Sequence, residues 1–214
     1  MNFLAHLYFS GNNHHSLLGN LMGDFVKGRA ISYSDRKSVD GIKLHRKIDK
    51  YTDSHPIVRQ SKNRIQSERK RYAGIMIDVF YDHFLAKNWS RYSNDNFEQQ
   101  VQNWYVKLNS ETHIILPDRM RLTLKLMRDE DWLSTYKSTE GISNTIDRIA
   151  GRIRFENRLK GGGEELVDQY DALENDFNLF FRHLKHFVES ERMTVNQNIA
   201  KCSKINRINY ETTA

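Results

Sequence analysis

The sequence has little cysteine and little proline. Its single cysteine, Cys202, excludes an intrachain disulfide and any zinc site built on several cysteines. Only Pro56 and Pro117 represent proline among the 214 residues. Because proline and glycine clusters usually separate strands, whereas long stretches here keep a helical spacing of apolar residues, the sequence predicts an all-α protein with a single helical domain.

Long hydrophobic runs and two common catalytic motifs are also missing. No apolar run approaches the roughly 20 residues that a membrane-spanning helix needs. The opening MNFLAHLYFS lacks the basic start and small-residue cleavage site of a signal peptide, so we expect a cytoplasmic protein without membrane contact. The absence of a P-loop and of a GxSxG elbow leaves P-loop and serine-hydrolase chemistry unsupported.

The apolar periodicity predicts helices along most of the chain. The expected helices cover residues 14–28, 36–53, 56–70, 72–90, 94–110, 117–134, 138–160 and 163–190. The segment HIIL at 113–116 is the strand candidate. We expect the single domain to cover residues 1–190 and the polar segment 191–214 to form a frayed tail.

The apolar segment GIMIDVFYDHFLAKNW, residues 74–89, contains two aspartates and a histidine. On a helix, Asp78 and Asp82 lie about 40° apart on one face, and His83 points about 100° further round. Carboxylates on a helix that is apolar nearly all round are costly unless they are paired or bind a cation. Ion pairs with arginine or lysine and a metal site are both consistent with this pattern.

A second segment, GIKLHRKIDKYTDSHP at 41–56, carries His45, Asp49 and Asp53 at i, i+4 and i+8. These side chains form one stripe on a helix, and lysines occupy the opposite face. The stripe is either a chain of surface hydrogen bonds and helix caps or a set of ligands for a divalent cation. Imidazole and carboxylate ligands suit Mn²⁺ or Mg²⁺ better than a thiolate-seeking metal.

Further candidates lie in the first 28 residues. Asn20 and Asp24 share one face of SLLGNLMGDFVKG at 16–28, and His6 lies within the apolar NFLAHLYF. Taken singly, Asp24 is typical of a helix cap and His6 of a hydrogen-bonded core histidine. A cluster of histidines and aspartates in the first 83 positions, without cysteine, nevertheless suits metal-assisted hydrolysis, in which a cation activates water and neutralises a phosphoryl oxygen.

Four segments in this order resemble the acyl carrier protein phosphodiesterases, also called acyl carrier protein hydrolases. They are NFLAH at 2–6, LLGNLMGDFVKG at 17–28, LHRKIDKYTDSHP at 44–56 and DVFYDHFLAKNW at 78–89. A weaker likeness continues through RIRFENRL at 152–159 and FNLFFRHLKHFVE at 177–189. Two positions depart from the family pattern: Arg182 stands where we expect a proline, and Tyr8 where a histidine is common.

The resemblance implies an all-helical relative of the HD-type metal phosphohydrolases. Such an enzyme removes the 4′-phosphopantetheine prosthetic group from holo acyl carrier protein by metal-assisted phosphodiester hydrolysis, with Mn²⁺ as the expected cofactor and Mg²⁺ as the alternative. The resemblance makes Asp24, His45 and Asp49 the candidate catalytic residues. The metal ligands that it implies are His6, Asp24, His45, Asp78, Asp82 and His83.

The net charge of +6 suits an acidic partner, and acyl carrier proteins are acidic. We expect four basic residues to bind or steer this substrate: Lys27, Arg46, Lys50 and Arg59. Ordinary solvated helix faces would show the same distribution of basic residues. The basic residues of 117–160 are an alternative docking surface. Two other functions stay open: hydrolysis of a nucleotide or another small phosphodiester, and, less favoured, non-catalytic nucleic-acid binding.

Overall fold

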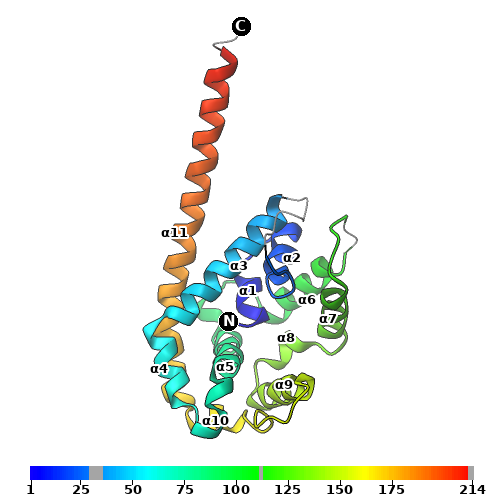
Figure 1. Ribbon diagram of the computed structural model, residues 1–214, viewed down its shortest axis with the longest axis vertical. Coiled ribbons are helices and arrows are strands. Elements are labelled where there is room, and N and C mark those ends of the chain that lie inside the picture. The colour runs from blue at the N-terminus through cyan, green and yellow to red at the C-terminus, as the bar shows by residue number, and fades with distance from the viewer. Residues whose placement is uncertain (29–35, 111–112, 212–214) are drawn as a thin grey trace.

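The computed structural model describes residues 1–28, 36–110 and 113–211, and it describes side chains as far as residue 194. Every regular element within these ranges is a helix, which confirms the all-α prediction (Figure 1). In chain order the elements are α1 (Phe3–Tyr8), α2 (His14–Met22), α3 (Arg36–Ser54), α4 (Pro56–Arg64), η2 (Ser67–Tyr72), α5 (Ala73–Lys87), η3 (Trp89–Arg91), α6 (Phe97–Leu108), α7 (Asp118–Asp129), α8 (Trp132–Thr135), α9 (Thr139–Arg152), α10 (Glu164–Asp168) and α11 (Tyr170–Glu211).

Several expectations about local structure are wrong. The helices expected over 56–70, 117–134 and 138–160 end early, at Arg64, Asp129 and Arg152. Residues 113–116 form a bend and irregular backbone instead of a strand, because the described chain offers no second strand for them to pair with. The helix expected over 14–28 ends at Met22, where Gly23 follows and the chain enters a turn. The amides of Phe25 and Val26 both donate to the carbonyl of Met22 in this turn.

Helix α5 lies at the centre of the hydrophobic core. Most of its fifteen residues are buried, as expected for a helix that is apolar nearly all round. The rings of Tyr81 and Phe84 pack on Phe177 of α11 at centroid distances of 5.4 and 5.8 Å. This packing fixes α5 against α11, so the face that carries Asp78 and Asp82 is directed toward α1.

Helices α2 and α3 cross closely because glycine lies on both. A Cβ atom at Gly19 would lie 2.3 Å from the carbonyl oxygen of Ser38, and one at Gly41 would lie 2.7 Å from the amide nitrogen of Asn20. Neither distance can be accommodated by a larger residue without moving a helix. The glycines therefore allow side chains from both helices to reach the same small volume beside α1.

The C-terminal half of α11 projects away from the rest of the molecule (Figure 1). Residues 191–211, which the sequence predicts as a frayed tail, continue this helix without a break. Glu191 pairs with Lys47, and Arg192 donates to the carbonyl oxygen of Phe9, so the start of the extension is attached to the body. The domain boundary at residue 190 stays a prediction.

None of the described helices is both long and apolar enough to span a membrane.

Candidate metal centre

Three side chains from two helices form a compact group, which we call the His/Asp group: His6 of α1 with His45 and Asp49 of α3. Their ligand atoms all lie within 4.8 Å of one another. Asp49 bridges the two imidazoles, with its Oδ1 3.1 Å from His6 Nε2 and its Oδ2 3.0 Å from His45 Nε2. The two rings stack with their centroids 3.9 Å apart.

Neighbouring residues of α2 fix the orientation of both rings. His6 Nδ1 donates to Asn20 Oδ1 at 3.0 Å, which directs the other ring nitrogen toward Asp49. The ring of His45 packs against the backbone at Gly23, where a Cβ atom would lie 2.1 Å from His45 Cδ2. An imidazole ligand commonly has its second nitrogen or its ring plane held in this way.

Asp24 lies beside this group in the turn that follows α2. Its Oδ1 is 3.5 Å from His45 Nε2, and 47% of its side chain is exposed. Because α2 ends before residue 24, the carboxylate is presented by a turn rather than by a helix face. Arg46 secures the same turn by donating to the carbonyl oxygens of Val26 at 2.9 Å and Gly28 at 2.8 Å.

Asp78 and Asp82 approach the group from α5 in different ways. Asp78 Oδ1 lies 2.9 Å from the α-amino nitrogen of Met1, which is itself 3.9 Å from Asp49 Oδ1. Asp82 is fully buried, and its carboxylate accepts from the backbone amides of Leu4 at 2.7 Å and Ala5 at 3.3 Å. Because these amides belong to the first turn of α1, Asp82 anchors that helix and so positions His6.

His83 and Asp53 lie outside the group. His83 Nδ1 donates to the carbonyl oxygen of Tyr136 at 2.8 Å, and its Nε2 lies 2.9 Å from the Tyr170 hydroxyl. The rotation of about 100° between adjacent helical residues points His83 away from the face that carries Asp82. Asp53 pairs with Lys62 at 2.8 Å. A ligand role for His83 stays a prediction, and it would require both of its contacts to break.

The electrostatics of the group reflect an excess of negative charge. Burial alone would lower the pKa of His45, but its hydrogen bonds with Asp24 and Asp49 raise it to about 9. Burial and the nearby His45 lower the pKa of His6. Although burial opposes it, hydrogen bonding with His45 holds the pKa of Asp49 well below its usual range. At neutral pH the free group therefore contains a neutral His6, a protonated His45 and an ionised Asp49. Burial raises the pKa of Asp82 to about 7.

These features fit a divalent cation. His6 Nε2 carries a lone pair toward Asp49 Oδ1 when Nδ1 donates to Asn20, and a cation between them would remove the resulting repulsion. His45 Nδ1 is buried without a hydrogen-bond partner among the described residues. Within the described ranges no lysine or arginine side chain pairs with Asp24, Asp49 or Asp78. Imidazole nitrogens and carboxylate oxygens are the donors expected around Mn²⁺ or Mg²⁺.

The predicted docking residues have two kinds of environment. Arg46 is occupied with the turn that carries Asp24, as described above. The other three are exposed: Lys27, Lys50 and Arg59. Exposure on α3, α4 and the turn after α2 is compatible both with substrate steering and with ordinary solvated surface.

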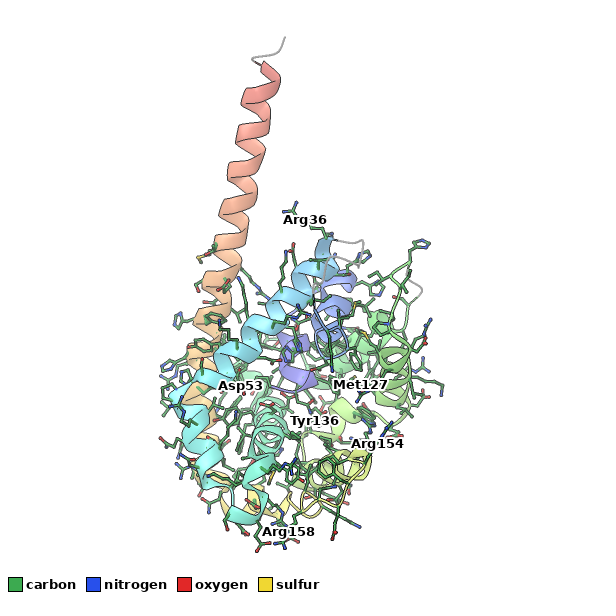
Figure 2. The ribbon with its side chains drawn as sticks, in the orientation of Figure 1. Arg36, Asp53, Met127, Tyr136, Arg154 and Arg158 are labelled. Atoms are coloured by element: carbon green, nitrogen blue, oxygen red, sulfur yellow. The ribbon has the colours of Figure 1, made fainter. Side chains whose placement is uncertain are left out.

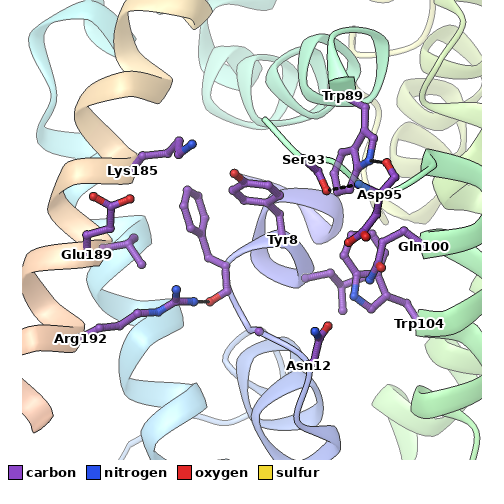
Figure 3. A pocket seen from close by; sticks show the side chains of 14 residues that line it. Tyr8, Asn12, Trp89, Ser93, Asp95, Gln100, Trp104, Lys185, Glu189 and Arg192 are labelled. Carbon is purple, nitrogen blue, oxygen red and sulfur yellow. Dashed lines mark hydrogen bonds between the residues drawn. The ribbon is translucent and has the colours of Figure 1, made fainter. Parts of the chain in front are cut away.

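A separate cavity of about 280 Å³ lies at the C-terminal end of α1 (Figure 3). Tyr8, Trp89 and Trp104 contribute aromatic walls, and α11 contributes charged side chains. The Trp89 indole already donates to the carbonyl oxygen of Asp95 at 2.9 Å. None of the predicted catalytic, metal or docking residues lines this cavity, so it is distinct from the His/Asp group.

Comparison with known proteins identifies the family of this chain. Residues 1–184 match the family model described as acyl carrier protein phosphodiesterase. The chain belongs to the acyl carrier protein phosphodiesterase family. The proteins of that name from Salmonella agona (strain SL483) and Escherichia coli (strain K12 / DH10B) are each 36% identical to it over 184 residues, 85% of this chain and 94% of each relative. The one from Enterobacter sp. (strain 638) is 35% identical with the same coverage. No solved structure matches the chain.

Membership in the acyl carrier protein phosphodiesterase family confirms the resemblance seen in the four sequence segments. The matched region contains the whole His/Asp group and ends within α11. The relation to HD-type metal phosphohydrolases stays a prediction. Of the two departures from the family pattern, Tyr8 donates to the carbonyl oxygen of Tyr92 at 2.9 Å, and Arg182 is exposed on α11, so neither contacts the His/Asp group.

Sequence reasoning missed two residues that shape the centre. The sequence pattern places Asn20 only on a face with Asp24 and assigns no role to Gly23, yet these two residues orient His6 and His45. The sequence feature that could have indicated a close helix crossing is the four-residue spacing of Gly19 and Gly23, with Asn20 between them. Such spacing permits a close helix crossing, but it does not identify which side chain fills the space.

Proposed function

We propose that this protein hydrolyses the phosphodiester bond joining 4′-phosphopantetheine to the serine of holo acyl carrier protein. Its relatives are named acyl carrier protein phosphodiesterases, which supports both the reaction and the substrate. The observation that carries the proposal is the convergence of His6, His45 and Asp49 in the matched region, because this donor set suits a reaction on a phosphoryl group.

The same three residues are the proposed holders of a divalent cation, with Asp24 and Asp78 as the nearest further carboxylates. When bound, Mn²⁺ or Mg²⁺ would lower the pKa of a water molecule and neutralise charge on a phosphoryl oxygen. His45 must lose its proton to become a ligand, so cation binding should weaken as the pH falls below the pKa of this imidazole.

Among the chain's own groups, Asp24 is placed to accept a proton from water. Its carboxylate is half-exposed and is held 3.5 Å from His45 Nε2, so it faces both solvent and the centre. In the proposed reaction the water oxygen bonds to phosphorus, the bond from phosphorus to the serine oxygen breaks, and that oxygen leaves with a proton. The products are apo carrier protein and free 4′-phosphopantetheine. Asp49 and Asn20 keep the imidazoles in place during this exchange.

The direct test is incubation of the purified full-length protein with holo acyl carrier protein and Mn²⁺, followed by intact mass spectrometry. We expect the carrier protein to lose its phosphopantetheine and the reaction to stop on addition of a chelator. Turnover of small phosphodiesters with none of the carrier protein would favour a small-substrate hydrolase. Tight RNA or DNA binding with a steep salt dependence, and no turnover, would favour a nucleic-acid binder.

A further inference from the structure

A cavity of about 420 Å³ opens at Asp24, on the side of the centre that faces α7 and α9. Phe3 and Phe25 form apolar parts of its lining, and Arg119 of α7 and Arg152 of α9 supply its positive charge. Among the described residues that line it, Asp24 is the only one with a carboxylate. The cavity therefore joins the proposed reaction centre to a surface with more positive than negative charge.

This surface is not the one formed by the predicted docking residues. Met127 of α7 and Arg154, which follows α9, lie across the molecule from Asp53 at the end of α3 (Figure 2). Arg59 belongs to α4 and Lys50 to α3, on the Asp53 side. The cavity at Asp24 thus provides a basic surface that adjoins the His/Asp group from another direction.

The two arginines of the cavity differ from their neighbours because neither makes a close ion pair with a described carboxylate. Among the described residues, no carboxylate oxygen lies within ion-pairing distance of Arg119 or Arg152. By contrast, Arg121 of α7 pairs with Asp118 at 2.6 Å, and Arg148 of α9 pairs with Glu130 at 3.1 Å. Glu130 attracts Arg152 only from beyond ion-pairing distance. Two guanidinium groups without a close ion pair at one cavity are suited to an external anion.

Arg152 is also held in place without losing its charge. Its guanidinium carbon lies 5.1 Å from the centroid of the Trp132 ring, which is buried and stacks on Phe3 at 6.3 Å. The Trp132 indole donates to Glu130 Oε2 at 2.8 Å, which fixes the ring. Stacking restricts an arginine side chain while leaving its N–H donors available. Burial and the nearby cations of Arg148 and Arg119 lower the pKa of Arg152.

We propose that Arg119 and Arg152 bind an anionic phosphate group of the substrate in the cavity beside Asp24. This inference rests on the proposed function, which supplies a phosphodiester as substrate. A guanidinium presents a planar set of donors that matches phosphate oxygens. The carboxylate of Asp24 would repel an anion in this cavity, and the two arginines supply the charge that outweighs that repulsion.

The first test reads binding without relying on turnover. The full-length chain, without added metal, is titrated with inorganic phosphate at constant ionic strength by isothermal calorimetry. We expect saturable binding that weakens at least tenfold in the double variant Arg119→Gln/Arg152→Gln. The matched control Arg121→Gln removes the same charge from α7 but does not line the cavity, so its affinity should equal that of the wild type. No binding by the wild type, or equal affinity in the double variant, would overturn the proposal.

The second test separates the phosphate from acidic side chains of the carrier protein. With Mn²⁺, the double variant should show at least a tenfold rise in KM for both holo carrier protein and bis-p-nitrophenyl phosphate, with an unchanged melting temperature. A rise for the carrier protein alone would overturn the assignment and place the arginines at the protein–protein contact. If the wild type does not act on holo carrier protein, the proposed function fails, whereas the phosphate titration still decides the role of the arginine pair.

Discussion

Two acidic groups within the same helical body differ in how their charge is balanced. Asp176 of α11 is 4% exposed, and its oxygens accept from Gln60 at 3.0 Å, Ser61 at 2.8 Å and Arg64 at 2.9 Å. Asp49 has a side chain that is 38% exposed, and it contacts imidazoles with no lysine or arginine side chain paired to it among the described residues.

This difference separates a structural carboxylate from one suited to bind a cation. Asp176 has a matching cation and several hydrogen-bond donors, so its charge is satisfied within the fold. Among the described residues around Asp49 the carboxylates outnumber the side-chain cations, and the excess charge lies close to solvent. Removing the first group should therefore affect stability, and removing the second should affect chemistry.

The largest expected effect is on turnover in Asp49→Asn. This change removes the bridge between His6 and His45 and one proposed ligand, so kcat/KM on holo carrier protein should fall about 10³-fold, or by roughly 4 kcal/mol. The metal-free variant should also lose part of the stabilisation that Asp49 gives to protonated His45, so kcat/KM is measured on the folded protein. The matched control is Asp53→Asn one turn further along α3, which should keep wild-type activity. Comparable activity in both variants would remove Asp49 from the centre.

Asp176→Ala should lose stability and keep turnover. It leaves Arg64, Gln60 and Ser61 without their shared acceptor, and loss of one partner of a largely buried pair costs about 3 kcal/mol. Urea unfolding should detect this loss, while kcat/KM on the remaining folded protein stays near the wild-type value. A stable variant with lost turnover would contradict the division between the two acidic groups.

The pH dependence of stability tests the excess charge around His45. Its pKa is about 9 in the folded protein against an ordinary value of 6.5, so the folded state holds this proton more tightly than the unfolded state. The stabilisation is fully present below pH 6.5 and is lost as the pH rises to about 9, with a total on the order of 3 kcal/mol. Urea unfolding of the metal-free protein at several pH values measures this loss.

The variant His45→Gln supplies the reference for that measurement. It retains the polar character of the position but cannot take up a proton, so the part of the decline due to His45 should disappear between pH 6.5 and 9. Identical pH profiles for the wild type and this variant would show that Asp24 and Asp49 do not raise the pKa of the imidazole. The contrast between the carboxylates around Asp49 and the neutralised Asp176 would then lose its electrostatic support.

The smallest expected effect concerns charge outside both groups. Reversing Lys50 and Arg59 together to glutamate should raise KM for the carrier protein a few-fold and flatten the salt dependence of kcat/KM, because steering acts on the encounter. Exposed charges act weakly one at a time, so the single variants should show almost nothing. Steady-state kinetics at several salt concentrations provide the measurement. An unchanged salt slope would leave the surface at α7 and α9 as the docking face.

Local features of this protein were predictable because they depend on residues close together in sequence. The stripe of His45 and Asp49 follows from helical periodicity, and both side chains do share one site. The start of α4 at Pro56 follows from the conformation that proline favours in a first helical turn. The continuation of α11 through residue 211 was missed, because a helix once begun can extend through a segment without a clear apolar periodicity.

Residue types and their spacing establish the helical class, the helix faces and the kinds of ligand available. The packing of the helices establishes which faces meet. His6 reaches Asp49 across 43 positions, whereas Asp82 and His83, adjacent in sequence, face different partners. Arg119 and Arg152 reach the cavity at Asp24 from helices that the sequence motifs do not connect with the centre. The reason is physical: helical geometry is fixed by local backbone hydrogen bonds, but contacts between helices depend on close packing along the whole interface.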